Sequence, residues 1–421
     1  MSYKKRKKQL VSLFEVPDDE NDRLAYSYLF SILSSVEQIA VLAAERGAGV
    51  KGQLEDELVH RDAFKNVAKK CGGYRDDCPE IKELIEYLTN LKGETSMAAL
   101  NVVAEGWLGC IFENIAHLSP KFFNSVGEDE NRHNGYALAY KIPNSHELEP
   151  IIRDLEYLLF KIAQSPNFIL PITHFLGLHD TGKMGLKVKE AHIKSCNHLN
   201  VKYNLNDYTK FCRGAILSKN NQPVEASMNT WQKNKQNIWN VSHDILIQEE
   251  YDIKINNPLK IQAKIIEALG KILQIEPRFK LVTRNKKLYY VQRSMIGIRA
   301  MYDNSQLMTI YIDANQRYNN LLKGLINKTR RSINKEYKLI PDVNHLLPIL
   351  PPSQCPIILS YIGKYGTKWG YTQNGDIEGV SITLFLGENE NGKQPITIVA
   401  DHRVHDGHDI TLFAHMLKRF L

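Results

Sequence analysis

Residues 396–407 of this chain read ITIVADHRVHDG, an apolar β-branched run followed by a turn that contains His402, Asp406 and Gly407. The β-branched run predicts a buried strand, and Gly407 permits the backbone angles of a sharp turn after it. Imidazole titrates in the range that a general base needs, so His402 is the candidate base that takes a proton from an acyl acceptor. Asp406 is the candidate residue that fixes the loop presenting the imidazole. The spacing therefore predicts an acyl-transfer site after a strand, with an ordinary polar turn as the alternative.

This motif resembles one in the catalytic domain of the dihydrolipoyl acyltransferases of 2-oxo acid dehydrogenase complexes, which is related to chloramphenicol acetyltransferase. Residues 401–407 match the family's Asp-His-Arg-x-x-Asp-Gly, and residues 359–363 (LSYIG) resemble its Ile-Ser-x-Leu-Gly run. The resemblance implies that Ser360 donates a hydrogen bond to the oxyanion of the tetrahedral intermediate. It also implies a chloramphenicol acetyltransferase-like α+β domain with a mixed sheet over residues 230–421. In the related trimers the histidine of one chain faces the serine of the next, so a homotrimer or a multiple of it is expected.

The apolar patterns within residues 230–421 predict three strands and two helices. The strands are expected at 245–253, 288–292 and 307–312, and the helices at 258–274 and 318–337. Nothing in the sequence resembles a lipoyl domain. The acyl group is therefore expected to arrive on a separate carrier, as a thioester of coenzyme A, of an acyl carrier protein or of a lipoyl protein.

The first half of the chain predicts a domain of a different kind. Apolar residues recur with a period of about 3.6, and Gly, Pro and Ser turn signals separate the periodic stretches, which indicates an all-α bundle over residues 22–165. The expected helices lie at 22–46, 51–70, 79–91, 95–117, 120–141 and 147–164.

Four of these helices carry carboxylates on their apolar faces. In chain order the residues are Glu37, then Glu57 with His60, then Glu105, then Glu130 with His133. Residues three apart on a helix share a face, so each Glu-x-x-His presents an oxygen and an imidazole nitrogen to one point. Two such pairs with two further glutamates are the ligand set of a dinuclear site in a four-helix bundle. Burial of four carboxylates requires cations, so two iron or manganese ions are expected. The pattern resembles the ferritin-like superfamily, which implies oxidase or oxygenase chemistry.

Charge and composition limit the remaining possibilities. The net charge is +7, and the run KKRKK at residues 4–8 supplies five positive charges, so the rest of the chain is nearly neutral and a nucleic-acid-binding face is not expected. Residues 1–21 are expected to form a disordered basic tail, and residues 166–229, where the periodicity fades, a connecting region. No membrane span or secretory signal is expected, and the scattered cysteines suit reduced thiols in the cytoplasm.

The two halves together predict a bifunctional enzyme that pairs thioester-dependent acyl transfer with a dinuclear-metal oxidase. Two alternatives remain open. The bundle could be a non-catalytic scaffold for an acyltransferase. The second domain could instead be a degenerate module that binds an acyl carrier for a di-iron oxidase, because the segment between Ser360 and His402 is shorter than the family pattern.

Overall fold

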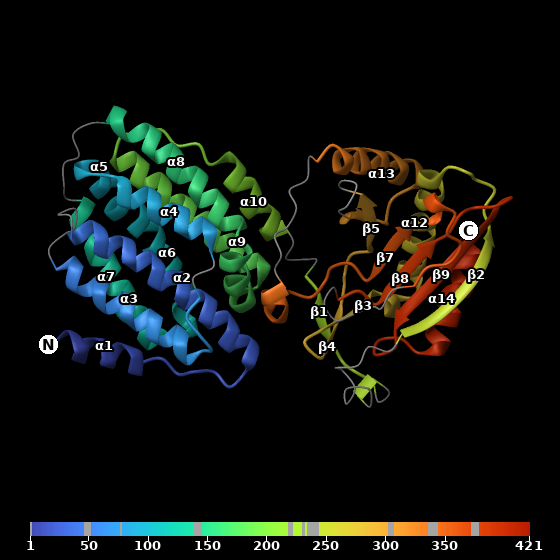
Figure 1. The fold of residues 1–421 in the computed structure, drawn as a ribbon, viewed down its shortest axis with the longest axis horizontal. Helices are drawn as coiled ribbons and strands as arrows, with labels where there is room; N and C mark the ends of the chain where they lie inside the picture. Colours follow the sequence, from blue (N-terminus) through green and yellow to red (C-terminus); the bar gives the residue numbers. More distant parts are fainter. Residues whose placement is uncertain are drawn as a thin grey trace. The chain divides into compact units, whose positions relative to one another are not determined.

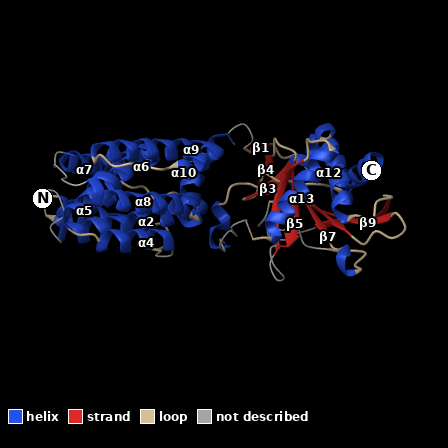
Figure 2. Ribbon diagram, turned by 90° about the horizontal axis from the view of Figure 1, so that it is seen from above, coloured by secondary structure: helices blue, strands red, loops and turns tan. Residues whose placement is uncertain are grey.

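The chain forms two compact units, Met1–Lys219 with Val343–Leu350, and Asn220–Asp342 with Pro351–Leu421. In the computed structural model, unit 1 is helical and unit 2 contains the described strands (Figures 1 and 2). The structure describes residues 2–45, 52–75, 78–138, 145–217, 222–229, 232–233, 244–301, 307–335, 344–371 and 379–421. The predicted organisation, a helical first domain and a mixed-sheet second domain, is confirmed.

Unit 1 contains the predicted helices, with ends within a few residues of those expected. The stretch expected at 95–117 consists mainly of two α-helices that are joined by a π-helical segment. The described helices are α1 (Tyr3–Ser12), α2 (Glu20–Glu45), α3 (Gln53–Lys70), α4 (Pro79–Asn90), α5 (Gly93–Met97), the π-helix η1 (Ala98–Ala104), α6 (Glu105–Ile115), η2 (Ala116–Leu118), α7 (Pro120–Leu138), α8 (Ser145–Gln164), α9 (Pro166–His198) and α10 (Asn206–Leu217). Helix α2 packs along α3, and α6 packs along α7 (Figure 1).

An aromatic cluster fills one end of the space between these two helix pairs. Its rings come from all four helices and are fully buried: Phe30, Phe64, Phe112, Phe122 and Phe123. The rings of Phe30 and Phe123 stack with centroids 5.6 Å apart. Because Phe64 follows His60 by one helical turn, this packing fixes the rotation of α3 and so the direction in which His60 points.

Two stretches of unit 1 have the length and hydropathy of a membrane span, Glu20–Leu42 and Gly93–Leu118, whereas the sequence reading expected none. Of the residues in these windows, 78% and 67% are buried inside the unit. A helix that packs on most of its faces is apolar for that reason alone. Their composition is therefore that of core helices.

Two predictions about the ends of the bundle are wrong. Residues 3–12 form helix α1 instead of a disordered tail, and Leu10 is buried in the core of unit 1. Residues 166–217 form α9 and α10, which belong to the bundle, instead of a connecting region. The pattern of α9 was obscured because Gly177 has a non-helical conformation (φ 73°) and breaks the helix into two parts with different faces. The unit boundary thus falls after residue 219.

A short segment from the second half of the chain also belongs to unit 1. The 3₁₀-helix η6 (Asn344–Ile349) buries Leu346 and Ile349 against Ala25 and Tyr28 of α2. The prediction of an uninterrupted second domain over residues 230–421 is therefore wrong at this segment.

Unit 2 is built on a six-stranded mixed sheet with the order β2-β9-β8-β7-β5-β6, and a second sheet has the order β1-β4-β3. Strands β7 and β8 are parallel, as are β5 and β7, and the other pairs of the large sheet are antiparallel. The elements are β1 (Val224–Ala226), β2 (Asp244–Asp252), α12 (Pro258–Ile275), η5 (Pro277–Lys280), β3 (Leu281–Arg284), β4 (Lys287–Tyr290), β5 (Met295–Met301), β6 (Leu307–Asp313), α13 (Tyr318–Ile333), β7 (Ile357–Tyr361), η7 (Gly363–Tyr365), β8 (Ile382–Leu386), β9 (Lys393–Asp401) and α14 (Gly407–Phe420).

The continuous apolar run that predicted a strand at residues 396–400 lies in the inner strand β9. Eight of its nine residues are buried, because β2 and β8 flank it and both of its faces are covered. Helices α12 and α14 bury Leu269 and Phe413 in the same core as Ile398. This packing fixes the end of β9, and with it the start of the turn that carries His402.

Candidate metal centre and acyl-transfer residues

The six predicted metal ligands converge in the middle of the bundle. Each is at most 2% exposed. They form two overlapping groups in which the candidate ligand atoms all lie within 4.8 Å of one another. One group is Glu37, Glu57, His60 and Glu130, and the other is Glu57, Glu105, Glu130 and His133. Because Glu57 and Glu130 belong to both groups, the arrangement has two adjacent centres that share two carboxylates.

Each histidine points its Nδ1 atom at the glutamate of the other Glu-x-x-His pair. Nδ1 of His60 lies 3.1 Å from Oε1 of Glu130, and Nδ1 of His133 lies 3.0 Å from Oε1 of Glu57. The pairs sit on α3 and α7, so these contacts link the two halves of the bundle. Glu105 enters from α6 directly after the π-helix η1. Short π-helical segments often occur at functional sites, and this one has no signature in the sequence.

The opposite nitrogen of each histidine contacts an aspartate. Nε2 of His60 lies 3.2 Å from Oδ2 of Asp129, and Nε2 of His133 lies 3.2 Å from Oδ2 of Asp56. Arg132 contacts both aspartates, at 2.5 Å from Asp56 and 2.8 Å from Asp129. A carboxylate on the outer nitrogen fixes the tautomer and the ring orientation of a ligand histidine.

The electrostatics are those of a crowded acidic site. Burial and the neighbouring Glu57 raise the pKa of Glu37 well above its usual value, and burial and Glu130 do the same for the pKa of Glu105. Burial would also raise the pKa of Glu57, but the close approach of Glu37, His133 and His60 outweighs that effect and lowers it.

The pKa values of the two histidines are raised by their acidic neighbours. Burial opposes their positive charge, but hydrogen bonds to Asp129 and Glu130 raise the pKa of His60 well above its usual value. Bonds to Asp56 and Glu57 raise the pKa of His133 to about 9. The shifts of the two glutamates and the two histidines all favour the protonated forms, as is expected for carboxylates that are buried close together.

The residues fit a pair of divalent cations. Several buried polar atoms in the group have no aligned hydrogen-bond partner, and they are Oε1 of Glu37, both carboxylate oxygens of Glu57, Oε2 of Glu105, Oε2 of Glu130 and Nδ1 of His133. Buried oxygens without partners are costly unless they bind a cation. Four carboxylates and two imidazoles are a donor set for iron, manganese or zinc.

Three residues around this centre were not predicted from the sequence: Gln53, Asp56 and Asp129. Gln53 is fully buried and donates from Nε2 to Oε1 of Glu105 at 3.1 Å and to Asn101 at 2.8 Å. Asp56 and Asp129 each directly precede the glutamate of a Glu-x-x-His pair, so a repeated Asp-Glu-x-x-His could have revealed them. No local signal could have identified Gln53, because its role depends on the pairing of α3 with α6.

A second group of potential ligands, Glu156, His192 and Cys196, is also buried. Trp107 donates from Nε1 to Nδ1 of His192 at 3.3 Å, so the imidazole proton resides on Nε2, which lies 3.1 Å from Glu156. A metal bound through Nε2 would require a proton on Nδ1, which would oppose the indole N–H. The group is therefore a satisfied hydrogen-bond network between α6, α8 and α9, and it does not fit a metal.

His402 lies in the turn after β9 and is partly buried. Its Nδ1 atom lies 3.1 Å from the carbonyl oxygen of His405, which only accepts, so Nδ1 carries the proton and Nε2 the lone pair. That is the tautomer that a general base requires. Asp406 caps α14: its Oδ1 atom accepts from the backbone nitrogen of Asp409 at 2.8 Å. Its carboxylate fixes the turn that carries His402 by holding the first turn of the next helix.

Ser360 and His402 are at opposite ends of the sheet within one chain. Ser360 of β7 pairs with Phe385 of β8, which pairs with Thr397 of β9. β9 continues for four residues from Thr397 to Asp401, roughly 13 Å along the strand, before the turn that carries His402. The structure therefore does not bring the predicted base and the predicted oxyanion donor together within one chain.

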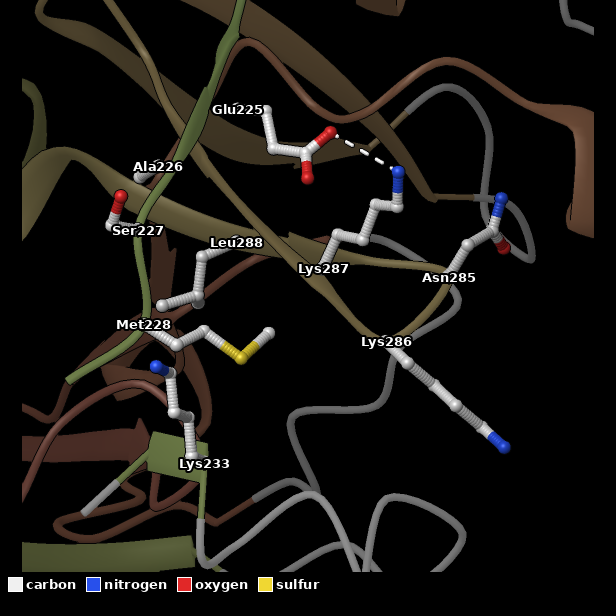
Figure 3. Close-up of a pocket in the computed structure, with 9 residues that line it drawn as sticks. All are labelled: Glu225, Ala226, Ser227, Met228, Lys233, Asn285, Lys286, Lys287 and Leu288. Carbon is white, nitrogen blue, oxygen red and sulfur yellow. Dashed lines mark hydrogen bonds and ion pairs between the residues drawn. The ribbon is translucent and has the colours of Figure 1, made fainter. Parts of the chain in front are cut away.

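A hollow of about 790 Å³ lies beside the smaller sheet of unit 2 (Figure 3). Lys287 pairs with Glu225 at 3.1 Å, and the side chain of Lys286 extends away from the other residues drawn. Both members of the ion pair are more than half exposed. Neither His402 nor Ser360 is among the nine lining residues, so we assign no catalytic role to this hollow.

No family model and no curated protein matches this chain. Solved structures that resemble it include three acyltransferases. Dihydrolipoamide acetyltransferase of Azotobacter vinelandii has 14% identity, covers 46% of this chain and 89% of its own, and gives a TM-score of 0.34. The truncated catalytic core of the 2-oxoacid dehydrogenase complex of Thermoplasma acidophilum has 15% identity, coverage of 46% and 95%, and a TM-score of 0.34. A chloramphenicol acetyltransferase has 15% identity, coverage of 48% and 100%, and a TM-score of 0.34.

Proposed function

We propose that this chain is a two-part enzyme in which unit 1 binds two iron or manganese ions and performs an oxidation with oxygen or peroxide, while unit 2 transfers an acyl group from a thioester. The observation that carries the proposal is the convergence of four buried glutamates and two histidines from α2, α3, α6 and α7. Such a set is strongly destabilising without cations.

Each residue of the proposed metal centre has a distinct part. Glu57 and Glu130, which belong to both groups, would contribute to holding both ions, whereas Glu37 and His60 would help to hold one ion and Glu105 and His133 the other. The bound ions would supply the redox chemistry. Asp56 and Asp129 hold the imidazoles, and the surrounding helices keep all six ligands out of contact with bulk water.

A mainly apolar cavity of about 90 Å³ in the same unit supports chemistry with a small apolar reactant. Its lining includes Val36 and Ala104, the chain neighbours of Glu37 and Glu105, together with Leu108, one helical turn after Glu105. An apolar cavity remains dry and accepts apolar guests. Its volume suffices for dioxygen or a few methylene groups.

In unit 2, the tautomer of His402 supports a role as general base. Nε2 would take the proton of an acceptor thiol, hydroxyl or amine as that atom attacks the thioester carbonyl. The hydroxyl of Ser360 from a neighbouring subunit would donate to the oxyanion, and collapse of the intermediate would expel the carrier thiolate, which takes up the proton from His402. Because Ser360 and His402 are far apart in one chain, this reaction requires a closed oligomer, and we propose a trimer.

Metal content tests the first activity. Protein purified without added metal or chelator should contain about two iron or manganese ions per chain. Glu130→Ala should lose the metal and the consumption of oxygen, and it should retain acyl transfer. If wild-type protein binds no metal even after anaerobic reconstitution with iron, the oxidase proposal is wrong and the bundle is a scaffold.

Acyl transfer is tested with acetyl-coenzyme A and with acylated carrier protein, by following the release of free thiol. His402→Ala should lower the rate by about 10²- to 10⁴-fold. His408→Ala is the matched control, because His408 is an exposed residue at the start of α14. Equal rates for the two variants would identify unit 2 as a carrier-binding module without catalysis.

A further inference from the structure

Helix α1 contacts the outer side of the proposed metal centre through one residue. The guanidinium of Arg6 lies 2.5 Å from Oδ1 of Asp56, 3.6 Å from Glu55 and 3.9 Å from Oδ2 of Asp129. Asp56 is 7% exposed and Asp129 is 18% exposed. Arg6 therefore joins the two aspartates that hold the histidines, although it is more than 45 residues away in the sequence.

Asp56 and Asp129, which pair with Arg6, differ from ordinary surface carboxylates in their other contacts. Asp56 lies 3.2 Å from Nε2 of His133, and Asp129 lies 3.2 Å from Nε2 of His60, so each carboxylate also holds an imidazole of the proposed centre. The guanidinium groups of Arg6 and Arg132 both contact these two aspartates.

The docking of α1 is supported by further contacts. Tyr3 donates a hydrogen bond to Asp62 of α3, and Lys7 pairs with the same carboxylate at 3.6 Å. Leu10 and Phe14 are buried in the core of unit 1. Fixed by these contacts, α1 forms one wall of a hollow of about 510 Å³.

The hollow reaches the proposed metal centre. Arg6, Gln9 and Leu10 of α1 line one side, and its other lining residues include His60 and Asp129. Nδ1 of His60 faces Glu130 inside the bundle, so the imidazole separates the hollow from the buried carboxylates. A change in the position of α1 would therefore alter both the support of the histidine ligands and the access to them.

We propose that Arg6 is a positioning residue of the metal centre: by pairing with Asp56 and Asp129 it fixes the orientation of His133 and His60, so that tight metal binding requires docked α1. This inference rests on the proposed function, because it assumes that the six residues bind metal. It assigns a role to the basic segment that the sequence reading placed in a solvated tail.

The test compares the full-length wild type with Arg6→Ala, Arg6→Lys and Lys5→Ala, each loaded anaerobically with Fe²⁺. The readout is the rate at which iron passes to an excess of a coloured chelator. Arg6→Ala should release iron about tenfold faster, which is the lower end of the effect of removing an outer contact of a metal ligand. Arg6→Lys should restore much of the slow release. Lys5→Ala removes the same charge from an exposed position of the same helix and should release iron at the wild-type rate.

A second readout separates positioning from loss of folding. The variants loaded with Co²⁺ should keep the wild-type far-ultraviolet circular dichroism, and the visible d–d bands should shift in Arg6→Ala but not in Lys5→Ala. If wild-type protein binds no metal, the proposed function fails and this inference fails with it. If wild type binds two ions and Arg6→Ala releases them at the same rate with the same spectrum, the role of Arg6 alone is overturned.

Discussion

Nε2 of His60 lies 3.2 Å from Oδ2 of Asp129, although the two residues belong to different Asp-Glu-x-x-His motifs on different helices. The converse contact joins His133 to Asp56 at the same distance. Each motif thus supplies one glutamate, one histidine and an aspartate that supports the histidine of the other motif. The two halves of the centre depend on each other, and a change in either motif should affect both metal positions.

Replacement of one supporting aspartate tests this reciprocity. Asp129→Asn keeps the size of the side chain but removes the charge that holds His60. Metal affinity should fall by about 10- to 100-fold, as is typical for outer contacts of ligand histidines. Competition with a chelator of known affinity measures the change. Asp154→Asn, a change to an aspartate on α8 that pairs with Tyr87, is the control and should leave the affinity unchanged.

The shared position of Glu57 predicts how metal stoichiometry responds to substitution. Glu57 belongs to both groups of ligands, whereas Glu37 belongs to one. Glu57→Ala should therefore abolish binding of both ions. Glu37→Ala should leave about one ion per chain, because the group of Glu57, Glu105, Glu130 and His133 remains complete. Metal analysis after gel filtration distinguishes these outcomes, and equal loss in the two variants would contradict shared ligation.

Much of this centre could be predicted because its ligands obey local rules. Glu57 and His60 are three residues apart on one helix face, and so are Glu130 and His133. The supporting residues were harder to predict, since Gln53 and Arg6 reach the centre only through the packing of α1, α3 and α6. The charge run around Arg6 has the composition of a solvated arm, and its docking depends on acidic residues of other helices and on the burial of Leu10, which the run itself does not reveal.

In unit 2 the strand before His402 could be predicted, but its relation to Ser360 could not. Strand register depends on pairing between distant segments, and no local pattern encodes the fact that Ser360 aligns with Thr397 through Phe385. Strand β5 was also missed, because its seven residues include Gly297 and Arg299 and lack a continuous apolar run.

The separation of Ser360 from His402 predicts complementation between inactive chains. His402→Ala and Ser360→Ala should each lose most acyl transfer. In mixed oligomers formed from equal amounts of the two variants, about one quarter of the sites should combine an intact histidine with an intact serine, if adjacent subunits build each site. Thiol release by co-expressed, differently tagged chains measures this recovery. Activity no greater than the sum of the separate variants would mean that the two residues do not share an intersubunit site.

The buried pair of Asp401 and Arg403 should be essential for the turn that carries His402. The guanidinium lies 2.7 Å from Oδ2 of Asp401, and the two side chains are 1% and 2% exposed. Arg403→Ala leaves a buried carboxylate without its partner, which typically costs about 3–5 kcal/mol. Asp401→Asn combined with Arg403→Met removes both charges and should be less destabilising than Arg403→Ala. Urea unfolding of unit 2 compares the variants, and a double variant less stable than Arg403→Ala would contradict this account.

His405 should make unit 2 less stable in mild acid. Its imidazole is 1% exposed, and burial lowers its pKa from 6.5 to about 4 against the opposing effects of Asp409 and Asp406, with Arg278 lowering it further. Between these two pH values the unfolded chain binds more protons than the folded chain, so the free energy of unfolding decreases as the pH falls through this window. The loss between pH 7 and pH 4 is roughly 3 kcal/mol.

Because neither ring nitrogen of His405 has an aligned hydrogen-bond partner, His405→Leu should retain stability at pH 7 and lose this part of the acid sensitivity. Hydrogen exchange of β9 and α14 in increasing urea, at pH 7 and at pH 4.5, measures the difference. An equal decrease in wild type and His405→Leu would show that other groups cause the acid sensitivity.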